Sequence, residues 1–179
     1  LLHLAEGVDA AAREHFLALQ DSPWKWAITE NLVVIHCTAL AAPDFTVLAQ
    51  HGASMVWSPL SNLLLYGQTA DVAAAKAAGV KIAIGPDWSP SGSRNVLGEL
   101  KAARVASQLA GGVFSDAELV AMATRTAAQI LKWDKALGSL QAGKQPDLIV
   151  VAGTTGEPYA HLLGADERRA EPGNGPGIA

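Results

Sequence analysis

Short apolar runs alternate with amphipathic stretches along most of this chain. The runs at 31–36 (NLVVIH), 54–57 (SMVW) and 80–85 (VKIAIG) are apolar at nearly every position, which is typical of buried strands. The first residues, Leu1 and Leu2, look like the end of another strand. Helical spacing and helix-start residues predict helices at 10–19, 43–51, 69–78 and 95–109. The pattern predicts an α/β fold with four βα units in series and helices on both faces of a parallel sheet.

The pattern changes after residue 110. Ser115 and Glu118 have the spacing of a capping box, which predicts a helix to about Ala123 and then a short helix at 127–131. A turn-rich stretch leads to an apolar run at 148–151, which predicts a strand outside the βα repeat. We expect three regions: the βα units and the helices that follow them at 1–131, a segment with one further strand at 132–163, and a disordered tail at 164–179.

The composition of the chain limits the kinds of molecule that the protein is expected to bind. The chain has 179 residues, half of them hydrophobic, which is enough for one sizeable core. A net charge of −4 without a basic run argues against nucleic acid and anionic membranes, so a small-molecule substrate is expected. The single cysteine, Cys37, leaves no intrachain disulfide, and no apolar run is long enough to span a bilayer. We therefore expect a cytoplasmic protein.

The first candidate chemistry lies at the start of the chain, in LLHLAEG. On a continuing strand, His3 and Glu6 would point to opposite faces of the sheet. Gly7 and the helical pattern after it predict that the strand ends between the two residues. His3 and Glu6 are then expected to converge on a turn between strand and helix.

Two more polar residues follow predicted strands. His36 and Asp87 come after the runs at 31–36 and 80–85, and the carboxyl ends of parallel strands lie at one edge of the sheet. One of the two histidines, His3 or His36, with Asp87 forms a plausible partial ligand set for Zn²⁺ or another borderline divalent metal, and the remaining histidine and Glu6 would then supply proton transfers. A metal with Glu6 nearby suits metal-assisted hydrolysis.

Each of these residues also has a structural explanation. His36 could bond a neighbouring loop, Asp87 could cap the turn after it, and Glu6 could sit in a first helical turn where the helix dipole favours carboxylates. The joint placement of the set at one sheet edge favours the functional interpretation.

Several segments, in order along the chain, carry a family resemblance: HLAE (3–6), IHC (35–37), SPLSN (58–62), IGPDWSPSGSRNVLGEL (84–100), MATRTAAQIL (122–131) and GSLQAGKQPDLIVV (138–151). They resemble motifs of the amidohydrolase superfamily, in the branch that contains nucleobase, guanine and S-adenosylhomocysteine deaminases and triazine chlorohydrolases. The last two segments are similar to the helix and strand that return the chain to a small β domain in that family. The resemblance implies the second half of a TIM-type (β/α)8 barrel and deamination of an amino-azine or amino-purine-like ring.

The resemblance also implies roles. His3 and Asp87 would be metal ligands, with zinc as the expected metal and iron or manganese as alternatives. Glu6 would carry a proton to the ring nitrogen or leaving group, and His36 would polarise the substrate and stabilise the developing oxyanion. Asp87 would also take a proton from the attacking water.

Three further residues are implied at the substrate. Ser61 and Asn62 belong to the P-x-S-N segment, and Trp88 stands where the family commonly has glycine after its aspartate. We expect Trp88 to narrow the mouth or stack on the substrate, with Ser61 and Asn62 beside it.

One departure from the family is serious. The superfamily takes two further ligands from an H-x-H motif on its first strand, and none of the five histidines makes that pattern: His3, His15, His36, His51 and His161. We therefore expect a fragment of a larger hydrolase, completed by an N-terminal half or a second copy of the chain. The alternative is a catalytically silent α/β module that serves in binding or assembly.

Overall fold

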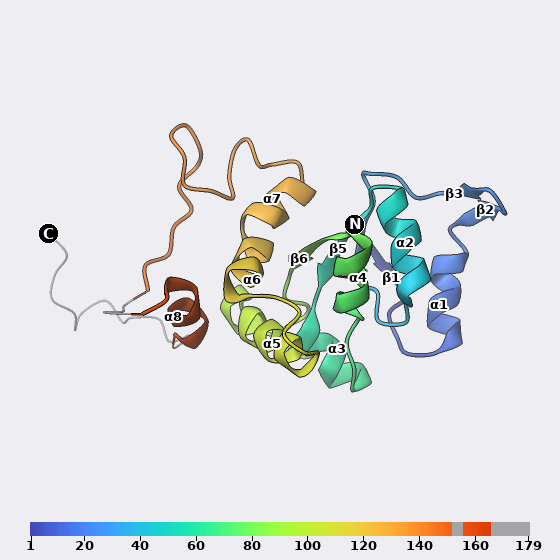
Figure 1. Cartoon of the computed structure of the whole chain (residues 1–179), viewed down its shortest axis with the longest axis horizontal. Coiled ribbons are helices and arrows are strands. Elements are labelled where there is room, and N and C mark those ends of the chain that lie inside the picture. The colour runs from blue at the N-terminus through green and yellow to red at the C-terminus, as the bar shows by residue number, and fades with distance from the viewer. Residues whose placement is uncertain (152–155, 166–179) are drawn as a thin grey trace, which may run out of the picture.

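Four short parallel strands form the centre of the molecule. The structure is a computed structural model that describes residues 1–151 and 156–165, and Figure 1 shows the sheet between two groups of helices. The strand order in the sheet is β1-β4-β5-β6, so consecutive strands of the βα units are neighbours. The strands are β1 (Leu2–Leu4), β4 (Val33–His36), β5 (Ser54–Trp57) and β6 (Lys81–Ile84). The predicted parallel sheet is confirmed.

The two faces of the sheet are covered to different degrees. In register, Val34 lies opposite Met55 and Met55 opposite Ile82, and all three side chains are buried in the main core. Side chains at the alternate positions point to the other face of the sheet; His3 and Ile35 are a pair on this face, and His3 is exposed. The predicted cover on both faces is therefore incomplete beside β1, which pairs with β4 along one edge only among the described strands.

Eight helices are described, and local sequence explains where several begin. Asp9, Asp71 and Asn95 each accept a hydrogen bond from a backbone N–H in the first turn of the helix that follows, and the predicted Ser115–Glu118 capping box is present. The helices are α1 (Ala10–Leu17), α2 (Ala42–Gln50), α3 (Pro59–Tyr66), α4 (Val72–Ala78), α5 (Val96–Leu109), α6 (Asp116–Ala123), α7 (Arg125–Ile130) and α8 (Pro158–Gly164). Figure 1 shows α1 and α2 on the side of β1, and α5 and α6 on the opposite side.

Some expectations from the sequence are wrong. Residues 148–151 form no strand, because no other described segment pairs with this apolar run. Helix α4 begins at Val72 rather than near residue 69, since Asp71 caps it. Four elements were not predicted: α3, α8, and the strands β2 (Gln20–Ser22) and β3 (Lys25–Trp26), which form a small antiparallel hairpin.

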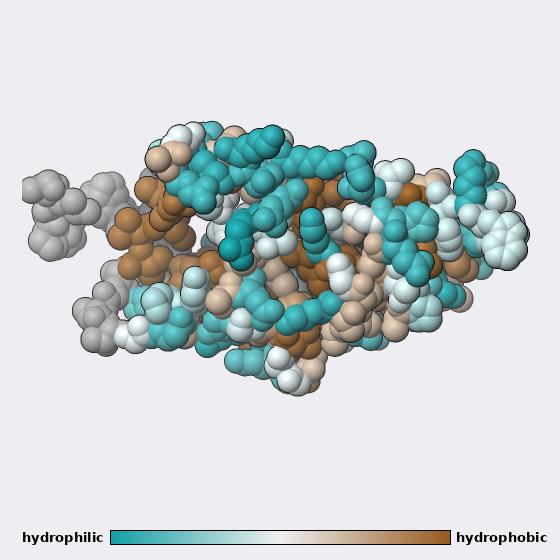
Figure 2. All heavy atoms as spheres, turned by 45° about the horizontal axis from the view of Figure 1, so that its top comes forward, coloured by the Kyte–Doolittle hydropathy of each residue, from teal (hydrophilic) through white to brown (hydrophobic). Residues whose placement is uncertain are grey.

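The segment after α7 leaves apolar side chains at the surface. Leu140, Leu148, Ile149 and Val150 are between 61% and 96% exposed, and Figure 2 shows brown, apolar atoms at the end of the molecule that carries this segment. Of the tail predicted to be disordered, 164–179, all but residues 164 and 165 lie outside the described residues, and Gly164 ends α8. Every helix in the described part of the chain is too short or too polar to cross a membrane.

An ion pair fastens α1 to α2. Two guanidinium nitrogens of Arg13 donate to the two carboxylate oxygens of Asp44, Nη2 at 2.7 Å and Nε at 2.8 Å. Burial of the Asp44 carboxyl disfavours its charged form, but the bonds from Arg13 and the Ala41 N–H outweigh burial, so its pKa lies below the ordinary 3.8. The charged form of Asp44 therefore stabilises the folded chain.

We predict that Asp44→Asn lowers the free energy of unfolding at about pH 6.5, and that its difference from the wild type shrinks as the pH falls below about 4. The sign follows from the lowered pKa, because the stabilisation is present above the unfolded-state pKa and is lost as Asp44 becomes protonated in the fold. Urea unfolding at several pH values measures the difference. Asp21→Asn, in an exposed pair with Lys25, is the control and should change stability little at any pH. A pH-independent effect of Asp44→Asn would contradict the prediction.

Candidate functional site

The carboxyl ends of three strands bring together the predicted metal-binding and catalytic residues. His3 lies within β1, His36 ends β4 and Asp87 follows β6 by three residues. One possible ligand atom from each of His3, His36 and Asp87 lies within 4.8 Å of the others. The two imidazole rings are 5.1 Å apart between centroids. Three side chains separated in sequence therefore form a potential metal-binding cluster.

A left-handed residue turns the chain between His3 and Glu6. Ala5 has a φ of 49° and is fully buried, and neighbouring backbone holds the turn: Cys37 N–H donates to Leu4 O at 3.1 Å and Ala39 N–H to Ala5 O at 3.0 Å. The turn directs the Glu6 carboxylate to the same side as the histidines, with Oε2 3.6 Å from His36 Nε2. His3 and Glu6 thus converge on one site as the sequence predicts.

His36 is buried and points one ring nitrogen at the site. Its Nδ1 lies 2.9 Å from Asn62 Oδ1, and a proton on Nδ1 makes this contact a hydrogen bond. Its Nε2 has no hydrogen-bond partner among the described residues and lies 4.0 Å from Asp87 Oδ2. Both His36 and Cys37 have positive φ, at 72° and 57°. The backbone leaves β4 in a strained conformation that is common at functional sites.

Helix α3 contacts three of these residues. Ser61 Oγ donates to Asp87 Oδ2 at 2.6 Å, Asn62 contacts His36, and the Tyr66 hydroxyl donates to Glu6 Oε1 at 2.9 Å. Ser61 and Asn62 are fully buried. One helix therefore fixes side chains that come from three different strand ends.

Asp87 remains a carboxylate in this environment. Burial raises its pKa, but the Ser61 hydroxyl and the Trp88 N–H donate to the carboxylate, and the two histidines add favourable charge interactions. The net effect is a pKa below the ordinary value of 3.8. Trp88 next to it is 71% exposed, so its indole ring is accessible from solvent.

One residue at this site, Tyr66, was missed by the sequence analysis, and a second, Glu99, was given no role there. Tyr66 reaches Glu6 only because residues 59–66 form a helix, which the sequence analysis did not predict. Glu99, in α5, is fully buried and accepts the Leu60 N–H through Oε1 at 2.9 Å, at the start of α3. Glu99 lies in the segment at 84–100 that resembles the family's motif around its aspartate, and this resemblance was the sequence signal for it.

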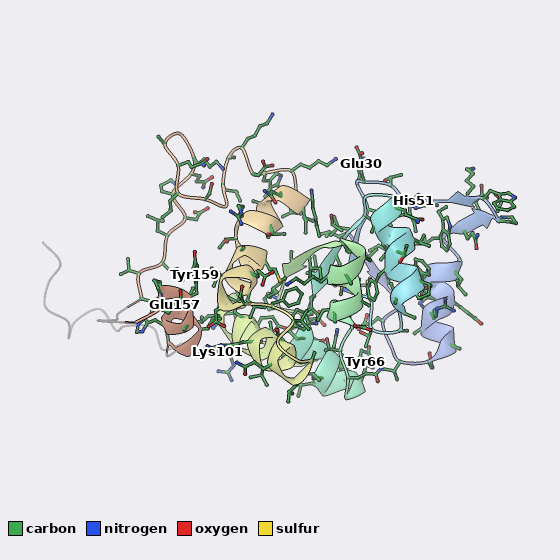
Figure 3. The ribbon with its side chains drawn as sticks, in the orientation of Figure 1. Glu30, His51, Tyr66, Lys101, Glu157 and Tyr159 are labelled. Carbon is green, nitrogen blue, oxygen red and sulfur yellow. The ribbon has the colours of Figure 1, made fainter. Side chains whose placement is uncertain are left out.

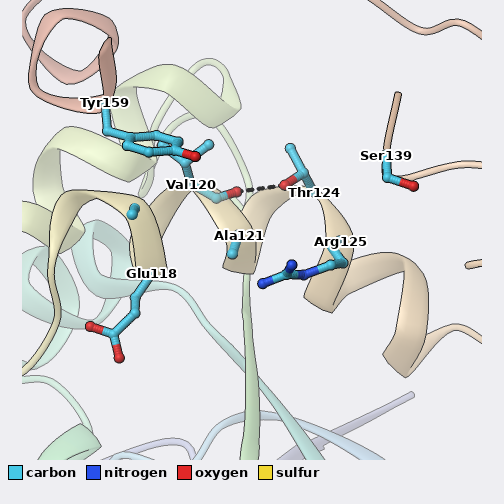
Figure 4. Close-up of a pocket in the computed structure, with 8 residues that line it drawn as sticks. Glu118, Val120, Ala121, Thr124, Arg125, Ser139 and Tyr159 are labelled. Carbon is cyan, nitrogen blue, oxygen red and sulfur yellow. Dashed lines mark hydrogen bonds between the residues drawn. The ribbon is translucent and has the colours of Figure 1, made fainter. Parts of the chain in front are cut away.

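A separate hollow lies away from the strand ends. It has a volume of about 350 Å³, and Figure 4 shows it beside α6, α7 and α8, with Tyr159 and Arg125 at its border. Thr124 Oγ1, also on its border, donates to Val120 O at 2.8 Å within the helix. None of the predicted site residues lines this hollow.

The sequence of this chain is similar to those of known proteins. A family model described as the amidohydrolase family matches residues 9–170. A 5-methylthioadenosine/S-adenosylhomocysteine deaminase from Moorella thermoacetica is 36% identical over 126 residues, which are 67% of this chain and 29% of that protein. The corresponding deaminase from Teredinibacter turnerae is 35% identical, over 65% of this chain and 27% of its own length. The chain thus spans under a third of these relatives.

Solved structures share the fold. An adenosine deaminase from Xanthomonas campestris with bound zinc aligns at a TM-score of 0.74 and 23% identity, over 91% of this chain and 40% of that one. E. coli guanine deaminase aligns at 0.67 and 26% identity, over 79% of this chain and 35% of its own. An atrazine chlorohydrolase from Arthrobacter aurescens in complex with zinc aligns at 0.73 and 23% identity, over 93% and 40%. The predicted barrel fold is confirmed as a partial (β/α) barrel.

We predict that Asn62→Leu lowers the free energy of unfolding by about 1–3 kcal/mol, because the buried His36 Nδ1 then lacks a hydrogen-bond partner. Leucine has a similar volume, so the change tests the polar contact more than the packing. Chemical denaturation measures the loss. Leu64→Ala is the control, since Leu64 is 62% exposed on the same helix and should change stability far less. Equal losses for both variants would show that the contact with His36 contributes nothing.

Proposed function

Since this chain belongs to the amidohydrolase family, we propose that it forms the carboxyl-terminal half of a metal-dependent hydrolase that deaminates an amino-purine-like or amino-azine ring. The observation that carries the proposal is the cluster of His3, His36 and Asp87 at adjoining strand ends, with Glu6 beside it. The named deaminases among its relatives support the reaction class. The small-molecule substrate expected from the composition fits this class.

The residues present fit a divalent metal. Imidazole nitrogen and carboxylate oxygen suit zinc, with iron and manganese as alternatives, and His36 Nε2 is buried without a hydrogen-bond partner in the described part of the chain. His3 and Asp87 would hold the ion. A bound divalent ion lowers the pKa of a coordinated water and so supplies a nucleophile near neutral pH.

The chain's own side chains would move protons around that nucleophile. Glu6 would transfer a proton to the ring nitrogen or the leaving amine through a carboxylate oxygen that faces the cluster. His36 keeps Nδ1 on Asn62 and would, when Nε2 is also protonated, donate from Nε2 to the developing oxyanion. Asp87 would accept a proton from the attacking water as well as hold the ion.

The substrate-binding assignments of Ser61, Asn62 and Trp88 stay predictions. Trp88 has the exposure that stacking on a planar ring requires. Ser61 and Asn62 are buried with Asp87 and His36 as partners, which supports a role in orienting those residues. We propose that α3 organises the site and that Trp88 borders the substrate.

Two protein ligands from this chain would hold a metal only weakly. The first-strand H-x-H ligands of the family are not among its five histidines, so we propose that a full site draws further ligands from outside these 179 residues. An N-terminal half or a second copy of the chain could supply them. The second candidate is a silent α/β module without hydrolase activity.

Metal content distinguishes these two candidates. We predict that the purified chain binds Zn²⁺ weakly at equilibrium with free metal, and that His3→Ala/Asp87→Ala does not, as elemental analysis of the two sides of a dialysis membrane would show. The control is His15→Ala/Asp134→Ala, which removes an exposed histidine and an exposed aspartate outside the site and should retain zinc binding. Equal zinc binding by the wild type and by His3→Ala/Asp87→Ala would favour the silent module, as would no binding by the wild type.

Activity tests the role of Glu6. We predict that Glu6→Gln, in a polypeptide that also carries the remaining family ligands, lowers kcat for ammonia release from amino-purine and amino-triazine probes by about 10²–10⁴-fold. The amide keeps the shape but cannot carry the proton. Glu14→Gln, on the exposed surface of α1, is the control. Full activity of Glu6→Gln would overturn the proposed role.

A further inference from the structure

The phenol of Tyr66 contacts the proposed proton carrier. Its hydroxyl donates to Glu6 Oε1 at 2.9 Å, although the two residues are 60 positions apart in the chain. Tyr66 is the last residue of α3 and is half-buried, and Figure 3 shows it at the lower edge of the molecule on that helix. The contact joins the end of α3 to the turn after β1.

The contact gives the two oxygens of Glu6 different surroundings. Oε1 accepts from Tyr66, whereas Oε2 lies 3.6 Å from His36 Nε2 on the side of the metal-binding cluster. The Glu6 side chain is 31% exposed and has several rotatable bonds, so without a partner it could adopt other rotamers. A phenol on one oxygen fixes which oxygen faces the reacting atoms.

We propose that Tyr66 is a positioning residue for Glu6, holding Oε1 so that Oε2 is the oxygen that carries the proton. This inference rests on the proposed function, because it assigns Tyr66 a task in the same reaction. It does not make Tyr66 a catalytic residue, since its hydroxyl contacts Glu6 and not the reacting atoms. The residue completes a set in which Ser61, Asn62 and Tyr66 each orient one functional side chain from α3.

The surroundings of Tyr66 keep its hydroxyl protonated, as a donor must be. Burial raises the pKa of the phenol, and the hydrogen bond and negative charge of Glu6 and the charge of Asp87 raise it further. Loss of the proton would place a phenolate next to a carboxylate, which is unfavourable. The contact with Glu6 therefore persists across the neutral pH range.

The chain offers a simple spectroscopic test because it contains only two tyrosines, Tyr66 and Tyr159. Figure 3 shows Tyr159 on α8, far along the molecule from Tyr66. In Tyr159→Phe, the rise in phenolate absorbance on alkaline titration reports Tyr66 alone. We expect a midpoint above 10.0, the ordinary value, and a lower midpoint in Tyr159→Phe/Glu6→Gln, with circular dichroism confirming that both remain folded. A midpoint that Glu6→Gln does not lower would overturn the proposal.

Kinetics in the metal-loaded, active polypeptide tests the consequence for catalysis. Tyr66→Phe removes only the hydroxyl, and we expect kcat to fall about tenfold with KM nearly unchanged, as the loss of one hydrogen bond to a charged group would produce. Tyr159→Phe is the matched control and should keep both constants. An unchanged kcat, or a rise in KM alone, would overturn the positioning role.

The two measurements separate this inference from the proposed function. The alkaline titration needs no catalysis, so a midpoint that depends on Glu6 in a chain without deaminase activity would contradict the proposed function and leave the Tyr66–Glu6 contact established. An active enzyme whose Tyr66 titrates independently of Glu6 would overturn the inference alone.

Discussion

The arrangement of the site depends on hydrogen bonds from one helix to the ends of neighbouring strands. A parallel sheet brings residues to a common edge, but it does not set the rotamers of long side chains at that edge. Helix α3 does so through Ser61, Asn62 and Tyr66, which contact Asp87, His36 and Glu6. Asn62 and Tyr66 lie on one face of α3 because they are four positions apart, and Ser61 is the neighbour of Asn62 in the sequence. Moving α3 would disturb all three functional groups together.

The start of α3 is itself fixed by a buried acid. Glu99 is fully buried and accepts the backbone N–H of Leu60, one of the N–H groups at a helix start that has no partner within the helix. Ser58, the residue before α3, donates from its hydroxyl to Gly85 O at 2.8 Å, which joins the helix to the segment after β6. The backbone strain at Ala5 and His36 costs on the order of 1–3 kcal/mol at each residue, and surrounding contacts of this kind offset it.

Much of the fold could be predicted from local patterns, and the errors have physical causes. Strands β4, β5 and β6 lie within the predicted apolar runs, and the candidate residues His36 and Asp87 lie at the end of β4 and shortly after β6. Helix α3 was missed because its polar side chains Ser61 and Asn62 are the buried ones, whereas Leu64 and Leu65 are exposed. The run at 148–151 resembles a strand, but a strand exists only with a neighbour to share its backbone hydrogen bonds, and none of the described segments provides one. Tyr66 could not be found without knowing that α3 crosses to Glu6.

The buried thiol of Cys37 offers a way to observe motion at this site. Cys37 is fully buried directly after His36, in a turn whose backbone holds β1 and β4 together, and burial raises its pKa. A thiol in this state reacts with alkylating reagents only when the turn opens. Because the chain has no other cysteine, its rate of alkylation would report the opening of this turn directly, without an introduced label. The alkylation rate of Cys37 therefore measures how often the ends of β1 and β4 separate.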